Sequence, residues 1–310
     1  MNNLLLNPFF SIIIPSFNRG SFLTSTILSV KNQKFINWEL IIVDDGSTDD
    51  TKEVVNEFLN DNRIKYFYQD NSERSAARNK GISVSLGDFI CFMDSDNIMD
   101  SERLNILYKS LKNNMFLEAV YYTDIIYFSP NNNNTFIKYG NHFSTPVEIN
   151  ELINKIIATP QLCISKKVLS EFKFDERISI GEDLELLFRI VQKYPLLYLE
   201  NNVTITEINH ENRSVSFRSK SSIKQLRTLK IMFSKNHPAN KVDKSLKNKL
   251  LSEVYYNASV DYFKNFKTKA LKFILLSLWK DPLSDKTLFK LNLLMSFILL
   301  RKKRINKLLN

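Results

Sequence analysis

Apolar runs of strand length alternate with amphipathic helical segments along the first hundred residues. The run FFSIIIP, from Phe9 to Pro15, precedes a helical pattern from about Ser21 to Asn32, and WELIIV, from Trp38 to Val43, precedes the helical pattern TKEVVNEFL. The alternation continues with strand, helix and strand patterns at residues 64–68, 75–86 and 88–93. Strands that alternate with helices of this length form a parallel sheet with helices on both faces. The sequence therefore predicts an α/β chain with a Rossmann-like, mostly parallel sheet.

Polar clusters follow three of these predicted strands. Ser16 to Arg19 follow the first strand, Asp44 and Asp45 follow the second, and Asp94 to Asp96 follow the fourth. In open parallel sheets, ligands bind outside the carboxyl ends of the strands, so the three turns should converge on one edge. Two carboxylates one residue apart repel each other unless a positive group lies between them. We therefore expect a cation and an anionic ligand at this edge.

The glycine spacing excludes the usual phosphate-binding loops. The six glycines, at positions 20, 46, 81, 87, 140 and 181, are never spaced as GxGxxG or GxxxxGK. Neither a Rossmann dinucleotide site nor a P-loop is present. A divalent cation held by carboxylates, Mg²⁺ or Mn²⁺, is the expected substitute for neutralising phosphates.

Charge divides the chain into two parts. Residues 1–219 contain 22 Lys and Arg against 28 Asp and Glu, whereas residues 220–310 contain 21 against 5. The corresponding net charges, −6 and +16, indicate a boundary near Ser219 to Ser222. The chain has 310 residues, of which 44% are hydrophobic, which is enough for a sizeable core. We predict a globular domain at 1–219 and a helical, basic region at 220–310.

Cysteine usage and hydropathy favour a protein of the cytosol. Cys91 and Cys163 stand far apart in apolar surroundings, which offers neither a disulfide framework nor a CxxC metal site. The N-terminal MNNLLLNPFF has no basic region, and its apolar run is too short for a signal peptide. No segment reaches the roughly 18 consecutive apolar residues of a membrane span. We expect a soluble or membrane-surface protein.

The basic region reads as helices over about Ser245 to Phe263 and Thr268 to Trp279, with a last helix from about Lys286. That last helix joins an apolar stretch to the basic cluster Arg301 to Arg304, a combination suited to an anionic membrane surface. Packing on the globular domain or on a second subunit, as a homo-oligomer, is the alternative. No nucleic-acid partner is expected, because no recognition motif accompanies the charge.

Five motifs in order resemble the family 2 glycosyltransferases of GT-A fold. They are FSIIIPSFNR, WELIIVDDGSTDDT, SAARNKGI, FICFMDSDN and ISIGEDLELLFRI, and the match runs from about Phe9 to Asn212. The resemblance implies inverting transfer of one sugar from a nucleotide sugar, a UDP-sugar above all, to a hydroxyl of a glycan. It also implies a nucleotide-sugar-binding part at about 9–100 and an acceptor part at about 101–219.

The resemblance assigns roles to individual residues. The donor would be contacted by Pro15, Ser16, Asn18, Arg19, Asp45, Arg74, Arg78, Asp94 and Ser95, with Asp45 reaching the base and the two arginines lying near the diphosphate. Asp96 would bind Mn²⁺ or Mg²⁺ directly, with Asp94 and His210 as the other candidate ligands. Asp183, paired with Glu182, would be the general base that takes the proton of the attacking hydroxyl. Such a base is required because the acceptor oxygen must lose its proton as it attacks.

Simpler interpretations stay open for each motif. DDGSTDD is also typical of a turn in which Gly46 allows a sharp bend and Ser47 or Thr48 caps a helix. Glu182 and Asp183 could serve only as charges in the first turn of a helix. Arg78 could pair with a surface carboxylate, His210 could be structural, and Asp94 and Asp96 could belong to a solvated loop. At the level of function, the alternatives are a sugar nucleotidyltransferase and an inactive nucleotide-sugar-binding or membrane-tethering module.

The resemblance also suggests the partners. The acceptor would be a glycan, such as a lipid-linked intermediate of a bacterial surface polysaccharide or lipooligosaccharide. The protein would then work in the cytoplasm, peripherally on the inner-membrane surface. Neither the sugar nor the linkage can be read from the motifs, since loops between Val120 and Pro160 would shape the acceptor pocket.

Overall fold

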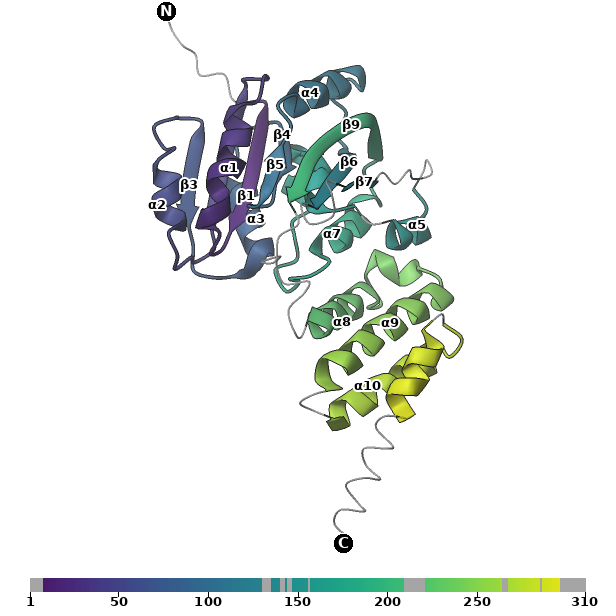
Figure 1. Ribbon diagram of the computed structural model, residues 1–310. Coiled ribbons are helices and arrows are strands. Elements are labelled where there is room, and N and C mark those ends of the chain that lie inside the picture. The colour runs from purple at the N-terminus through teal and green to yellow at the C-terminus, as the bar shows by residue number, and fades with distance from the viewer. Residues whose placement is uncertain are drawn as a thin grey trace, which may run out of the picture. The chain divides into compact units, whose positions relative to one another are not determined.

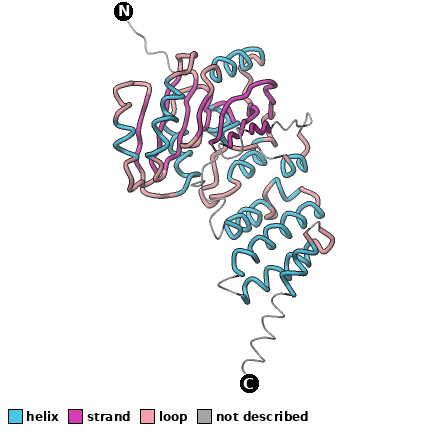
Figure 2. Tube along the Cα trace, in the orientation of Figure 1, coloured by secondary structure: helices cyan, strands magenta, loops and turns pink. Residues whose placement is uncertain are grey.

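The computed structural model describes residues 8–129, 135–139, 143, 147–155, 157–208, 221–263, 267–284 and 286–295. Its contacts divide the chain into two compact units, Met1–Asn212 and Arg213–Asn310. The first unit carries the sheet and the motifs. The second unit is helical over its described residues, as Figure 2 shows.

The described strands of the first unit form one nine-stranded sheet in the order β3-β2-β1-β4-β8-β6-β9-β5, with β7 paired to β6 (Figure 1). Their bounds are β1 Phe10–Ser16, β2 Trp38–Asp44, β3 Ile64–Tyr68, β4 Phe89–Phe92, β5 Asn97–Met99, β6 Val120–Ser129, β7 Thr135–Tyr139, β8 Leu162–Ser165 and β9 Leu196–Ile208. The prediction of a parallel sheet is confirmed for β1 to β4, whose pairs are all parallel. Beyond β4 the sheet is mixed, because β8 pairs antiparallel with both β4 and β6.

Helices cover both faces of the parallel part. The helices of this unit are α1 Gly20–Lys31, α2 Thr51–Asn56, α3 Glu73–Val84, α4 Arg103–Asn113, α5 Ile149–Asn154, α6 Lys166–Glu171 and α7 Glu182–Ile190. Ile12 and Ile14 of β1 belong to the same buried cluster as Leu23 and Ile27 of α1. Ile13 points to the other face, where it meets α3 at Gly81. This alternation is the period of two expected of a strand buried on both sides.

The second helix differs in detail from the expectation. It ends at Asn56 rather than continuing to Leu59. The side chain that binds its first turn is Asp49, not Ser47 or Thr48: the Asp49 carboxylate accepts hydrogen bonds from the backbone N–H of Thr51 at 3.1 Å and from that of Gly20 at 3.1 Å. Asp49 therefore ties the starts of α1 and α2 together at the carboxyl edge of the sheet.

The second unit contains α8 Ser221–Met232, a short 3₁₀ turn at Pro238–Lys241, α9 Lys244–Phe263, α10 Lys267–Lys280 and helical residues 287–295. Ala270 and Ile274 on the inner face of α10 are fully buried, with Tyr256 and Tyr262 of α9 packed against them. Across the described part of the chain, we find no helix that is both long and apolar enough to cross a bilayer.

Candidate functional site

The turns after β1 and β2 interlock through side-chain hydrogen bonds. Pro15 and Ser16 are the last residues of β1, and Asn18 lies just beyond them with a left-handed backbone, at φ 52°. The Asn18 carboxamide oxygen accepts from the backbone N–H of Thr48 at 2.8 Å, and the Asn18 N–H donates to Ser47 Oγ at 2.9 Å. Asn tolerates this backbone region better than most residues, which explains its place in the motif.

Arg19 and Ser16 complete this turn. The backbone N–H of Arg19 donates to Thr51 Oγ1 at 3.2 Å, and its guanidinium lies 5.5 Å from the centre of the Phe22 ring. Ser16 is buried, and its hydroxyl has no hydrogen-bond partner among the described residues. A buried hydroxyl without a partner at the end of β1 is free to bind a polar ligand group there.

Asp45 is buried and held in place. One of its carboxylate oxygens accepts hydrogen bonds from Gln69 Nε2 at 2.7 Å and from the backbone N–H of Ser72 at 2.9 Å. Burial raises the pKa of Asp45 above its ordinary value, and these hydrogen bonds oppose that rise. Sequence reasoning missed Gln69 and Ser72, because the DDGSTDD motif carries no information about the loop after β3.

Arg78 joins three separate parts of the chain. It is only 2% exposed, its Nη1 donates to Glu182 Oε1 at 2.6 Å, and its Nη2 donates to Asp94 Oδ1 at 3.3 Å. Arg74 lies 3.9 Å from the same Glu182 oxygen. Helix α3, the end of β4 and the start of α7 therefore meet at one guanidinium.

Two further residues of α3 hold the segment that leads into α7. Ser75 Oγ donates to the backbone oxygen of Ile178 at 2.6 Å, and Asn79 exchanges hydrogen bonds with the backbone of Phe174 at 2.9 and 3.0 Å. The Phe174 ring lies 5.4 Å from the Arg78 guanidinium carbon. Apart from Phe174 and Ile178, these residues belong to the motif SAARNKGI. The motif thus positions the start of α7 across about a hundred residues of sequence.

The carboxylates at the start of α7 differ in pKa. Burial favours the neutral form of Glu182, but the neighbouring Arg78 and Arg74 charges outweigh it, so the pKa of Glu182 lies below its ordinary value. Burial, and then the Glu182 charge, raise the pKa of Asp183 to about 6. Two adjacent carboxyl groups with divergent pKa values are typical of acid–base sites. Gly181, at φ 76°, provides the left-handed residue from which the helix begins.

The turn after β4 presents Asp94, Ser95 and Asp96. Thr26 Oγ1 of α1 lies 3.0 Å from the backbone oxygen of Ser95 and 3.0 Å from that of Asn97. These hydrogen-bond contacts hold the turn against α1. Loss of hydration raises the pKa of Asp94; Arg78 opposes the rise and the charge of Asp96 adds to it. A bound cation would relieve this repulsion.

The residues present fit a divalent cation shared with a substrate. Among the described residues, no three His, Cys, Asp or Glu side chains cluster as a complete metal site. Asp94 and Asp96 supply oxygen ligands of the kind that Mg²⁺ and Mn²⁺ prefer, and such ions often take their other ligands from water and phosphate. His210, the third candidate ligand, lies outside the described residues, so its role stays a prediction.

Comparison with known proteins identifies the family. Residues 11–169, just over half of the chain, match the model of glycosyl transferase family 2. The chain belongs to this family, as its motifs predicted, and the predicted GT-A fold is confirmed. The chain is 34% identical over 185 residues to an uncharacterized glycosyltransferase of Rickettsia conorii, covering 59% of this chain and 30% of that relative.

Two other similarities are to an enzyme of known sequence and to a solved structure. The chain is 40% identical over 103 residues to the GalNAc(5)-diNAcBac-PP-undecaprenol beta-1,3-glucosyltransferase of Campylobacter jejuni, covering 32% of this chain and 33% of that enzyme. The crystal structure of S. aureus TarS 1–349 in complex with UDP-GlcNAc superposes with a TM-score of 0.64 at 18% identity, covering 93% of this chain and 88% of that one. The chain thus spans about a third of the length of the Rickettsia and Campylobacter relatives. It shares its fold with the TarS structure.

Proposed function

We propose that this protein is an inverting, metal-dependent glycosyltransferase that moves one sugar from a UDP-sugar to a hydroxyl of a glycan acceptor. The observation that carries the proposal is the pair of bonds from Arg78 to Glu182 and Asp94. Through these bonds, the start of α7, where the pKa of Asp183 is raised, lies beside the turn that carries Asp94 and Asp96. An acid–base group next to a phosphate-binding edge is what glycosyl transfer requires.

Asp183 is the proposed general base. With a pKa of about 6, its carboxyl is mostly ionised at neutral pH, yet basic enough to accept a proton from an attacking hydroxyl. Asp45 is the proposed base-recognition residue, because a carboxylate can only accept and the uracil N3–H can only donate. The Gln69 and Ser72 bonds would keep its carboxylate aimed at the base.

Asp96 and Asp94 would hold Mn²⁺ or Mg²⁺, with Arg74, Arg78, Ser16, Asn18 and Arg19 close to the donor. The ion, when bound, would neutralise charge on the departing nucleoside diphosphate. In the structure, the Arg78 guanidinium donates hydrogen bonds to the carboxylates of Glu182 and Asp94. We therefore assign Arg78 the positioning of these carboxylates, and leave the more exposed Arg74 as the arginine for the diphosphate.

For the acceptor, we propose a lipid-linked glycan. The support is the Campylobacter relative, whose name describes a substrate linked through a diphosphate to undecaprenol. Such an acceptor would be met at the cytoplasmic face of the inner membrane, by a protein attached peripherally. A sugar nucleotidyltransferase is the competing enzyme, and it would form a nucleotide sugar rather than consume one.

The decisive experiment is donor binding with and without metal. We expect UDP to bind the wild type more tightly with Mn²⁺ than with excess chelator, because the cation would bridge Asp96 and the diphosphate. The variant Asp96→Ala should bind UDP with the same affinity in both conditions, measured by calorimetry. Asp88→Asn, an exposed position before β4 at the other edge of the sheet, is the matched control. Metal-independent UDP binding by the wild type would contradict the metal assignment.

A further inference from the structure

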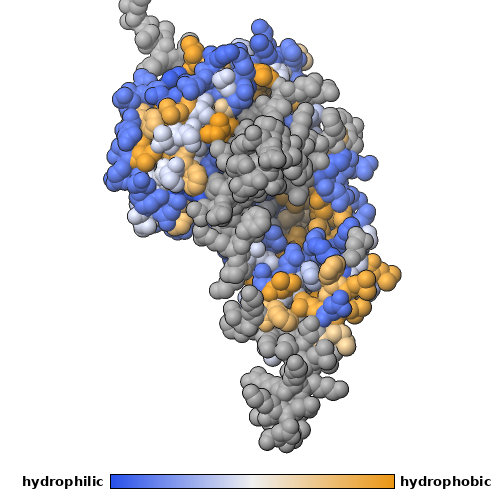
Figure 3. Space-filling view, in the orientation of Figure 1, coloured by the Kyte–Doolittle hydropathy of each residue, from blue (hydrophilic) through white to orange (hydrophobic). Residues whose placement is uncertain are grey.

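Five large apolar side chains between residues 275 and 289 of the second unit are exposed. Leu275 and Trp279 of α10, Leu283 of the following loop, and Leu288 and Phe289 of the next helix are 50%, 72%, 91%, 75% and 64% exposed. We call these five residues the apolar face. Figure 3 shows apolar residues gathered over this part of the second unit. Large exposed apolar side chains that gather in one region, rather than standing singly, indicate a site of interaction.

In the helical residues 287–295, one lysine is buried while large apolar side chains are exposed. Lys290 is 1% exposed, and its ammonium donates to Ser252 Oγ at 2.7 Å and to the backbone oxygen of Asp281 at 3.1 Å. Leu288 and Phe289, its neighbours along the helix, are the residues that point outward. A helix that faces water normally shows the opposite arrangement, since burying a lysine is costly. Leu293 and Leu294 of the same helix pack against the buried cluster of α10, so Leu288 and Phe289 are the side chains left for a further apolar partner.

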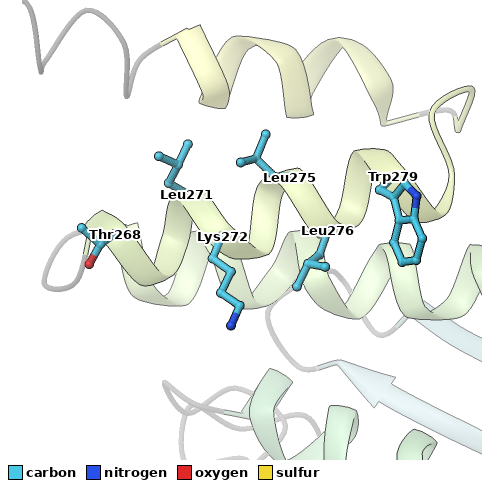
Figure 4. A pocket seen from close by; sticks show the side chains of 6 residues that line it. All are labelled: Thr268, Leu271, Lys272, Leu275, Leu276 and Trp279. Atoms are coloured by element: carbon cyan, nitrogen blue, oxygen red, sulfur yellow. The ribbon is translucent and has the colours of Figure 1, made fainter.

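Leu275 and Trp279 of the apolar face also line a groove on helix α10. Figure 4 shows the residues that line it, Thr268, Leu271, Lys272, Leu275, Leu276 and Trp279. Their spacing of three and four places them along one side of the helix. Its opposite side, with Ala270, Ile274 and Ser277, is fully buried. One side of α10 thus holds the unit together and the other is left for a ligand or partner.

Basic side chains accompany the apolar ones. The Lys280 ammonium lies 4.4 Å from the centre of the Trp279 ring, and Lys272 lies in the groove itself. Residues 220–310 carry a net charge of +16. Lysines beside exposed Trp and Leu are typical of surfaces that rest in a lipid headgroup layer, where the stem stays in the apolar region and the ammonium meets the phosphates.

We propose that the apolar face docks onto the surface of an anionic phospholipid bilayer, with Trp279, Leu283, Leu288 and Phe289 entering the interface. The occupant is a lipid surface rather than a second copy of this chain, because two units of charge +16 repel each other whereas anionic lipids attract both. Docking needs neither donor nor acceptor. The inference rests on the peripheral attachment proposed above and names the surface that would make it, and vesicle binding can fail while metal-dependent UDP binding succeeds.

The chain contains its own probe for this contact. It has two tryptophans, Trp38, which is 2% exposed in the sheet, and Trp279, which is 72% exposed. We expect vesicles of phosphatidylglycerol and phosphatidylcholine to shift the emission of the full chain to shorter wavelength. Trp279→Phe should abolish the shift. Phosphatidylcholine vesicles alone should give a much smaller shift, and added salt should weaken binding.

A binding assay separates the apolar face from the rest of the surface. In vesicle co-sedimentation, Leu288→Ser with Phe289→Ser should bind anionic vesicles about tenfold or more weakly, because two apolar side chains that would enter the lipid interface are lost. Ile36→Ser with Leu86→Ser, two exposed apolar positions of the first unit, should bind like the wild type. Asp183→Asn should also bind like the wild type, whatever its activity.

Two results would overturn the proposal. One is a wild type that leaves the vesicles in solution and shows no emission shift. The other is a concentration-dependent dimer, seen by light scattering, that dissociates in the Leu288→Ser and Phe289→Ser variant and does not bind vesicles. The second result would assign the apolar face to a second copy of the chain.

Discussion

At the scale of single residues, Arg78 is buried between carboxylates from distant parts of the chain. Breaking such a pair from one side leaves a buried charge uncompensated, which costs about 3–5 kcal/mol. We expect Arg78→Met to lower the free energy of unfolding by roughly this amount, measured in urea. Arg177→Met is the matched control, because Arg177 also binds a carboxylate, Asp175, at 2.6 Å but its side chain is 67% exposed. There we expect a loss below about 1 kcal/mol.

A double variant tests the same cluster further. Once Glu182 is changed to Gln, the more buried of the two carboxylates that Arg78 neutralises is gone, and Asp94 remains. Arg78→Met should therefore be less destabilising in the Glu182→Gln background than in the wild type. Equal losses in the two backgrounds would contradict a direct coupling between Arg78 and Glu182.

Asp183 gives a pH prediction with a definite sign. Its pKa is raised to about 6 by burial and by Glu182, so the carboxylate form needed to accept a proton is gained as pH rises through about 6. We expect kcat for sugar transfer to rise about tenfold per pH unit below that value and to level off above it. Asp183→Asn should lower kcat by about 10²–10⁴-fold and lose this slope. A variant with normal turnover would remove Asp183 as the base.

At the scale of elements, Gly81 sets the distance between α3 and β1. A Cβ added there would lie 2.5 Å from Ile13 Cγ2, which is closer than real contacts allow. Gly81→Ala should therefore push α3 away from the sheet and lower the free energy of unfolding by about 1–3 kcal/mol. It should also weaken UDP binding, since the same helix carries Arg74 and Arg78.

The neighbouring position is the control for this prediction. Lys80 is exposed on the same helix, so Lys80→Ala removes a side chain without a clash. Its free energy of unfolding should change by less than about 0.5 kcal/mol. If Gly81→Ala and Lys80→Ala behave alike, the close approach of α3 to β1 is not what holds the motif in place.

At the scale of the whole molecule, residues 1–219 carry a net charge of −6 and residues 220–310 a net charge of +16. This difference suggests that sugar transfer and membrane attachment belong to different parts of the chain. Deleting residues 296–310 removes five Lys and Arg and lowers the net charge from +10 to +5. Since the described apolar face remains, we expect weaker binding to anionic vesicles, by about tenfold or more at low salt, but not its complete loss. UDP affinity should stay unchanged. Complete loss of vesicle binding would place the whole attachment in the deleted residues.

Local patterns were enough to predict much of the first unit. The strands at residues 64–68 and 38–43, the helix after SFNRG and the polar turns at the strand ends all follow from short-range periodicity, and the structure contains them with small shifts in their bounds. The family and its fold followed from five motifs in order. These features are set by neighbouring residues, so a single sequence carries them.

Other features depend on residues that only the fold brings together. The antiparallel insertion of β8 next to β4, the bonds from Arg78 to Asp94 and Glu182, and the hold of Gln69 and Ser72 on Asp45 all join distant segments. The burial of Lys290 and the exposure of Leu288 and Phe289 likewise cannot be read from the order of residues. The sequence by itself determined the elements and the chemistry at their ends, because those are local. Tertiary structure decided which charges meet and which are buried, because pKa, desolvation and pairing depend on distance in space.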